Sequence, residues 1–522
     1  MRGVSDGMSR ALRCLLILSV LLCGAAVARA GEDRPLERGA AIIDSAILRE
    51  LDQGRFGLGR MLPPERSADT PLANSALFAL PSMSGVREAL EREFDRYVAK
   101  HRASLPNESI GVGDGFAFQL FDRGLFISPD VRFVLSGIVN RMDRAYVARA
   151  SCGEIRLIYR LTRTDAPLIG DNAVSQRLPM TLNLVLKAKG DGNDAAITCR
   201  EIARRWLATA NAPPTMDRLF GKDGPLDLVD AKNIDRIETN LQIAHAPKSP
   251  VRDFRTDYLL KVFDYDGETR RFVESPLENQ IDRDRILADE GLRRDFKAWL
   301  LDPGHFAELD RGTLVIPDKF LAKGAVAPTP TGFDVNDLEP EFGLVQGEGA
   351  NGKAVFSEAD VVGALQKAAA DGTRLQNIRS LAGFERRLND VTCAGCHQTR
   401  GIGGFHFPGV DWMAAKPSNS TVVPGSPHFF GDQIRRRDIL ASLSEGKTPD
   451  YSRGFSGRPQ LRGSTELAGT EYSDGWGAHC YSPGAKPAAA DRSFRDWTCA
   501  EGLACQVAGE ASRMGMCFVK GR

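Results

Sequence analysis

The sequence predicts a multidomain protein of the α+β class. Its 522 residues exceed the usual length of one domain. Alternating apolar and polar runs, typical of strands, are concentrated between residues 111 and 335, whereas apolar residues at helical spacing dominate later in the chain. Four cysteines lie within the last 43 residues. We therefore expect an N-terminal α+β domain, then a mainly helical domain, and a small disulfide-rich module at the C-terminus.

The composition sets limits on the class of function. Lys+Arg and Asp+Glu each number 68, so the formal net charge is zero. This balance gives no support to nucleic-acid binding. The hydrophobic fraction of 42% is sufficient for packed cores and is not typical of a disordered or fibrous chain.

The composition shifts and motifs divide the chain into six expected parts. They are a signal peptide at 1–30, a helical segment at 31–110, an α+β domain of unknown function at 111–335, a mainly helical domain at 336–445, a linker at 446–475 and a cystine-rich module at 476–522.

The first thirty residues have the pattern of a secretory signal peptide. Positive charges at Arg2, Arg10 and Arg13 precede an apolar or small-residue run at 14–28. A small-x-small site predicts cleavage after Ala30, which places the mature protein in the periplasm or outside the cell. Two alternatives remain open: a start at Met8, and an uncleaved membrane anchor. No later run is long and apolar enough to span a membrane, since a span needs about 20 apolar residues.

A helix with regularly spaced apolar residues is predicted before the α+β region. Val86, Leu90, Phe94 and Val98 recur every four residues and predict one amphipathic helix. Strands are then predicted at 131–139, 154–161 and 180–186. The runs at 258–263 and 271–273, which flank Asp266-Gly267, predict a hairpin.

Three helices are predicted between 336 and 445. Ser357 and Asp360 form a candidate capping box before the first. Leu375, Ile378, Leu381, Phe384 and Leu388 give the second an apolar stripe. The third begins at Ser426-Pro427, where Ser is a favoured cap and Pro suits the first turn.

Six cysteines are candidates for disulfides in an oxidising compartment. Cys152 and Cys199 lie far from the others and are expected to pair with each other. The remaining four allow three pairings, which the sequence does not distinguish. They are Cys480, Cys499, Cys505 and Cys517. A metal site in this tail is the alternative, but the tail lacks the usual C-x-x-C spacing.

The remaining two mature cysteines form the most specific motif in the chain. Cys393, Cys396 and His397 make the pattern C-x-x-C-H. Two thiols at this spacing can reach both vinyl groups of one porphyrin, and the adjacent His can ligate its iron. The alternatives are a thioredoxin-like redox pair, half of a zinc site, and a short-range disulfide.

On these residues the chain resembles the c-type cytochromes. The resemblance implies one covalent haem c, with thioethers to Cys393 and Cys396 and with His397 as the proximal iron ligand. It also implies a mainly helical, cytochrome c-like haem domain at 336–445 and attachment outside the cytoplasmic membrane, which agrees with the signal peptide. The resemblance is confined to the motif and its flanking helices.

The second axial ligand departs from the pattern of small c-type cytochromes, which use a later Met. The sequence offers three candidates: His428 at the start of the third helix, His406 between two Phe, and Met413. A fourth possibility is that none of them ligates, which would leave an open position on the iron. The run Arg435, Arg436 and Arg437 is interpreted as a solvated helix face, with contact to haem propionates as the alternative.

Three functions are compatible with the motif. The first is electron transfer by an exported single-haem protein, with a redox partner protein. The second is a haem-dependent oxidoreductase whose substrate site lies in the N-terminal domain. The third is a surface or binding protein with an appended haem module. The sequence does not identify catalytic residues, and it leaves the oligomeric state open.

Overall fold

The structure is a computed structural model. It describes residues 38–62, 71–147, 151–163, 177–189, 197–246, 256–329, 354–375, 378, 380–393, 409–413, 427–452, 479–481, 498–499, 502–507 and 514–519. The expected signal peptide and most of the expected linker lie outside these residues.

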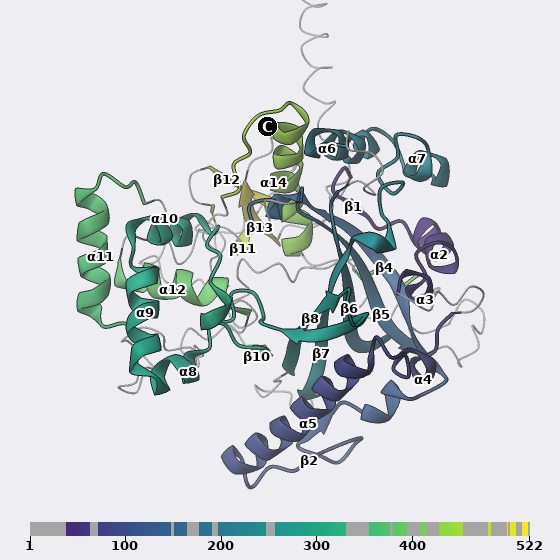
Figure 1. Cartoon of the computed structure of the whole chain (residues 1–522), viewed down its shortest axis with the longest axis horizontal. Helices are drawn as coiled ribbons and strands as arrows, with labels where there is room; N and C mark the ends of the chain where they lie inside the picture. Colours follow the sequence, from purple (N-terminus) through teal and green to yellow (C-terminus); the bar gives the residue numbers. More distant parts are fainter. Residues whose placement is uncertain are drawn as a thin grey trace, which may run out of the picture.

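A 10-stranded, mainly antiparallel sheet dominates the fold (Figure 1). Its backbone order is β1-β4-β5-β6-β7-β3-β2, and β8 lies on the other edge of β7, where it also pairs with β9 and β10. The strands are β1 (Ala41–Ile42), β2 (Ile110–Gly111), β3 (Phe118–Leu120), β4 (Val131–Arg141), β5 (Glu154–Arg163), β6 (Arg177–Lys187), β7 (Ile234–His245), β8 (Thr256–Asp266), β9 (Arg271–Ser275) and β10 (Ala325–Thr329). The predicted strands and the hairpin of β8 and β9 are thus confirmed.

The main hydrophobic core lies between one face of this sheet and the N-terminal helices. These are α2 (Ser45–Gln53), α3 (Leu58–Met61), α4 (Asn74–Leu77) and α5 (Ser84–Ser104). Val86, Leu90 and Phe94 of α5 are fully buried, which confirms the helix that the four-residue spacing predicts. They share one core with alternate residues of β4 to β8.

Helices that follow β9 in the chain form a second core of their own. Their bounds are α8 (Arg283–Ala288), α9 (Glu290–Leu300), α10 (Pro303–Arg311), α11 (Glu358–Ala370) and α12 (Leu381–Val391). They lie together on the left of Figure 1. The capping box of Ser357 and Asp360 is confirmed at the start of α11. The apolar stripe is buried as expected at Ile378, Phe384 and Leu388, although α12 begins only at Leu381.

The predicted mainly helical, cytochrome c-like domain at 336–445 is wrong. The sheet is the dominant element, and the helices of this segment belong to two different layers. α11 and α12 pack with α8 to α10, which precede the segment. α14 (Pro427–Ser444) instead packs against α6 (Cys199–Ala208). Apolar spacing identifies a buried helix face but not the element that covers it, which is why the sequence misled here.

α6, α7 (Met216–Phe220) and α14 lie at the top of the molecule in Figure 1. α7 follows α6, and β13 (Met514–Val519) contacts α14. β13 lies between β11 (His479–Tyr481) and β12 (Leu503–Val507) in a separate three-stranded sheet. Short 3-10 turns occur at Arg123–Phe126, Met142–Arg144, Thr209–Asn211, Ala231–Asn233 and Asp318–Phe320.

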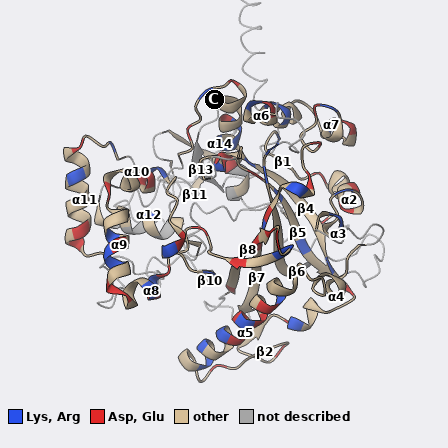
Figure 2. Ribbon diagram, viewed as in Figure 1, with Lys and Arg blue, Asp and Glu red and all other residues tan. Residues whose placement is uncertain are grey.

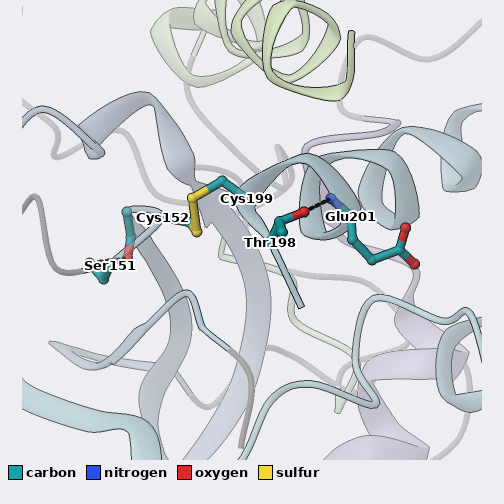
Figure 3. The surroundings of a disulfide bond; sticks show 6 residues. Ser151, Cys152, Thr198, Cys199 and Glu201 are labelled. Atoms are coloured by element: carbon teal, nitrogen blue, oxygen red, sulfur yellow. Dashed lines mark hydrogen bonds between the residues drawn. A yellow bond between two sulfur atoms is a disulfide. The ribbon is translucent and has the colours of Figure 1, made fainter. Parts of the chain in front are cut away.

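The predicted bridge between Cys152 and Cys199 is confirmed (Figure 3). It joins Cys152, two residues before β5, to Cys199, the first residue of α6. Thr198 caps this helix by accepting a hydrogen bond from the backbone N–H of Glu201 at 3.3 Å. In the C-terminal module, the pairs are Cys480 with Cys505 and Cys499 with Cys517. This settles the pairing that the sequence left open.

We expect removal of the first bridge to destabilise the fold strongly. The two cysteines are 47 residues apart. For a loop of this length, the chain-entropy relation gives about 4 kcal/mol. The variant Cys152→Ala/Cys199→Ala should therefore lose about that much free energy of unfolding in urea denaturation. An unchanged midpoint and slope would contradict the expectation.

Within the described residues, no helix has both the length and the apolarity needed to cross a membrane.

Candidate functional site

Cys393 lies on the face of the sheet opposite the main core. Leu259 and Phe263 of β8 belong to that core, whereas Leu260 and Val262 alternate with them and pack against Cys393. The Cys393 side chain is 6% exposed. Its Sγ lies 3.6 Å from the backbone carbonyl oxygen of Glu278, to which the thiol donates. Cys396, His397 and His406 lie outside the described residues.

The position of Cys393 is set by α12, which ends two residues before it. Arg387 of α12 is fully buried. Its Nε donates to the carbonyl of Leu309 at 2.9 Å, and its Nη2 donates to that of Asp310 at 2.7 Å. These carbonyls belong to the last turn of α10, where a guanidinium complements the helix dipole. Stacking of Phe384 on Phe306, with ring centres 5.5 Å apart, adds a second anchor.

A cavity of about 360 Å³ adjoins Cys393 on this face. This volume is within the range of small-molecule and cofactor sites. Its wall combines residues of the sheet, the segment 275–279 and the end of α12. Among its lining residues are five basic side chains and five acidic ones, namely Arg141, Arg144, Arg156, Arg236, Lys261, Asp235, Glu238, Asp264, Glu278 and Asp318. Figure 2 shows such charges interspersed along the strands.

Strands β5 and β7, which flank β6 in the sheet, hold an ionic cluster at the floor of this cavity. Arg156 of β5 donates to Glu154 from Nε at 3.0 Å and to Glu238 of β7 from Nη1 at 2.9 Å. Arg236 of β7 donates from Nη2 to Glu154 at 2.8 Å and to Glu238 at 2.7 Å. Each carboxylate therefore contacts both guanidiniums. This mutual pairing offsets the cost of burying four charges.

A second part of the cluster joins the sheet to α14. Asp143, whose side chain is fully buried, accepts from Arg141 Nε at 2.8 Å and from Arg435 Nη2 at 2.8 Å. Asp432 accepts from Arg435 at 2.7 Å and from Arg436 at 2.8 Å. Arg435 and Arg436 are only 4% and 5% exposed. The interpretation of this arginine run as a solvated face is therefore wrong for these two residues.

The ion pairs shift the pKa values of the buried carboxyl groups. Burial alone would raise the pKa of Glu154, but Arg236, Arg144 and Arg156 together hold it well below its usual range. Arg156 and Arg236 likewise lower the pKa of Glu238 against the effect of burial. Burial is also the largest influence on Arg436, and it lowers the pKa of this guanidinium to about 10.

These shifts predict acid lability with a definite sign. A carboxyl group with a lowered folded pKa binds protons more readily in the unfolded chain, so acid favours unfolding. We expect the free energy of unfolding to hold above about pH 5 and to fall by more than about 1 kcal/mol as the pH drops through 4. Urea denaturation at several pH values measures this. The slope should be smaller in Glu154→Gln, and equal slopes in both proteins would contradict the prediction.

Met413 lies away from Cys393. It packs against the main core, and its neighbour Trp412 donates from the indole nitrogen to the carbonyl of Leu135 in β4 at 2.8 Å. Cys393 packs on β8, which is four strands from β4 in the sheet order. At about 4.8 Å per strand, this separation is roughly 19 Å.

The other candidate on a described element is His428, the second residue of α14. The next residue, Phe429, is buried on Val139 and Ile158, on the same face of the sheet as Cys393. Pairing across the strands places Ile158, Glu238 of β7 and Val262 of β8 in one row. The start of α14 and Cys393 therefore lie over the same face and row of the sheet, on strands that are three apart, or roughly 14 Å.

The alternative of a metal site in the cystine-rich module is not supported. Cys480, Cys499 and Cys517 bring their sulfur atoms within 4.8 Å of one another. All three sulfurs are used in the two disulfides described above, so they are not thiolate ligands.

Comparison with known proteins gives no relative on which to rely. No protein-family model matches the chain, and neither a curated protein nor a solved structure matches it. The motif and the site around Cys393 are therefore the evidence for function.

The described residues fit a haem attached at Cys393. The cavity adjoins the thiol, and its arginines can pair with the two carboxylates that haem carries. Arg144 Nε is buried and makes no hydrogen bond, although it lies 3.3 Å from a Glu154 oxygen. Sequence reasoning missed this cluster, because charges alternating with apolar residues in a strand are typical of a solvent-exposed face.

Proposed function

We propose that this chain is an exported protein that binds one haem covalently through Cys393 and Cys396, with His397 as an iron ligand, and that it acts in electron transfer with a redox partner protein. The observation that carries the proposal is the C-x-x-C-H sequence. The burial of Cys393 beside a cavity with paired arginines supports it. The signal-peptide pattern at 1–30 supports export.

The chain's own residues would orient the group and shield it. A bound haem supplies a one-electron couple whose potential depends on its ligands and its burial. Arg387 holds α12 and thereby fixes the place of Cys393. The ionic cluster forms a rigid polar floor in which every carboxylate already has a cationic partner. Such a preorganised environment changes little when one charge is added or removed, which suits electron transfer.

We infer that the second ligand is a histidine rather than Met413, with His428 favoured over His406. Met413 packs against the main core, on the opposite face of the sheet from Cys393, whereas the start of α14 lies on the same face as Cys393. Met413→Leu should therefore leave the visible spectra of both oxidation states unchanged. A new band or a shifted potential in this variant would contradict the inference, because loss of a thioether ligand alters both.

The visible spectrum of the purified protein tests the proposal. The chain is produced with haem-attachment machinery, and oxidised and reduced spectra are recorded with and without carbon monoxide. Sharp reduced bands that carbon monoxide does not move are the expected result, because both axial positions are filled. Absence of haem absorbance would overturn the proposal.

One observation favours haem-dependent oxidoreductase activity as a second candidate. The cavity adjoins Cys393 and is lined largely by the N-terminal sheet, so a small polar substrate could bind beside the iron. A spectral shift on adding carbon monoxide would favour this second function, since it requires an open or labile iron position.

A further inference from the structure

The four arginines that line the cavity differ in how many of their guanidinium nitrogens already contact carboxylates. Arg156 contacts carboxylates through Nε, Nη1 and Nη2. Arg236 does the same, with Asp235 as a third partner at 2.9 Å. The guanidinium nitrogens of both residues are thus all engaged within the protein. These two arginines complete the ionic floor and have little capacity for a ligand.

Arg141 and Arg144 differ from this pair. The contacts described for Arg141 use Nε and Nη2, both toward Asp143. Arg144 pairs with Glu278 through Nη2, and its buried Nε lies 3.3 Å from a Glu154 oxygen without a hydrogen bond. None of the described contacts uses Nη1 of either residue. Their exposures are 1% and 7%, so the unused donors belong to buried side chains at the cavity wall.

A single residue connects Arg144 to the thiol of the motif. The carboxylate of Glu278 pairs with Arg144, and the backbone carbonyl of the same residue accepts from Cys393 Sγ. A planar group tethered at Cys393 would therefore extend toward the guanidiniums. Guanidinium forks bind carboxylates by paired, charge-assisted hydrogen bonds, which makes carboxylates the matching ligand chemistry.

We propose that Arg141 and Arg144 bind the carboxylate groups of the haem through their Nη1 donors, which none of the described contacts uses. This inference rests on the proposed function, because the carboxylates belong to the haem attached at Cys393. It replaces the alternative role of propionate contact that the sequence offered for the run Arg435 to Arg437, of which Arg435 and Arg436 pair with Asp143 and Asp432.

The pH dependence of the reduction potential tests the assignment. A carboxylate paired with a guanidinium stays ionised in both oxidation states, so the potential of the native holoprotein should be flat from pH 5 to 8. In Arg144→Gln, one carboxyl group of the haem loses its guanidinium partner, so it should take up a proton when the iron is reduced. The potential should then fall by up to about 59 mV per pH unit, the constant for one proton per electron.

Three further proteins make this experiment decisive. Arg144→Lys should restore the flat profile, because it keeps the charge. Arg141→Gln should independently produce a slope. Arg132→Gln is the control, since Arg132 also lies on β4 and pairs with a buried carboxylate, Asp52, at 3.0 Å, but is not part of the cavity wall. Its profile should remain flat. Flat profiles in both Arg144→Gln and Arg141→Gln would overturn the assignment.

Two additional readouts separate the possible causes of failure. Haem staining on a denaturing gel reports covalent attachment, so unstained native protein would reject the proposed function itself. Calorimetric titration of Cys393→Ala/Cys396→Ala with succinate tests for a free carboxylate ligand. We expect no binding heat. Succinate binding that Arg144→Gln abolishes would reassign the site to a free carboxylate and overturn the haem assignment.

Discussion

Replacing both thiols of the motif in Cys393→Ala/Cys396→Ala should abolish haem staining on a denaturing gel and remove the visible absorbance of the purified protein. The expected loss is complete, because thioether bonds are the only links that survive denaturation, and each requires one of these sulfurs. Cys393 is buried on β8, where alanine is tolerated sterically, so the folded sheet should persist.

The matched control removes two cysteines elsewhere. Cys152→Ala/Cys199→Ala should be less stable but should retain haem staining, because its bridge lies outside the motif. Circular dichroism of both variants checks that the fold is present. Retained staining in the motif variant would exclude covalent attachment through these thiols.

The second large effect concerns Asp143, the fully buried carboxylate that joins the sheet to α14. Asp143→Ala should lower the free energy of unfolding by about 3–5 kcal/mol, because it leaves Arg141 and Arg435 buried with one fewer anionic partner. Chemical denaturation with urea measures this loss.

An exposed ion pair provides the comparison. Asp95 pairs with Arg123 at 2.9 Å, and their side chains are 74% and 45% exposed. Asp95→Ala should cost less than about 1 kcal/mol, because water already solvates both charges. If the two substitutions cost the same, the buried cluster would not stabilise the contact between α14 and the sheet.

The sequence predicted local structure well where one residue pattern decides it. The spacing of Val86, Leu90 and Phe94 identified α5, and Ser357 with Asp360 identified the start of α11. The isolation of Cys152 and Cys199 in the sequence predicted their bridge. These features depend on neighbours along the chain or on a pairing with few alternatives.

Tertiary packing was less predictable. The spacing of apolar residues in α12 does not indicate that the helix packs on α10 rather than in a cytochrome c-like bundle. The alternation in β5 predicted the strand but gave no sign that Glu154 and Arg156 are buried. Their burial depends on groups distant in the sequence. One such group of the same cluster is Arg435, which contacts Asp143 across 292 residues. The signals for the cavity are therefore spread over distant segments.

The contact between Asp143 and Arg435 also limits how early in synthesis the charged face of the sheet can be covered. The ribosome produces Asp143 long before α14, so the charged face of the sheet must wait for nearly the whole chain before it is covered. Cys393 emerges in this interval, ahead of α14. Contacts of such long range slow folding. The buried residues that pack with Cys393 all precede it in the chain, so its packing on β8 can form while the charged face still lacks α14.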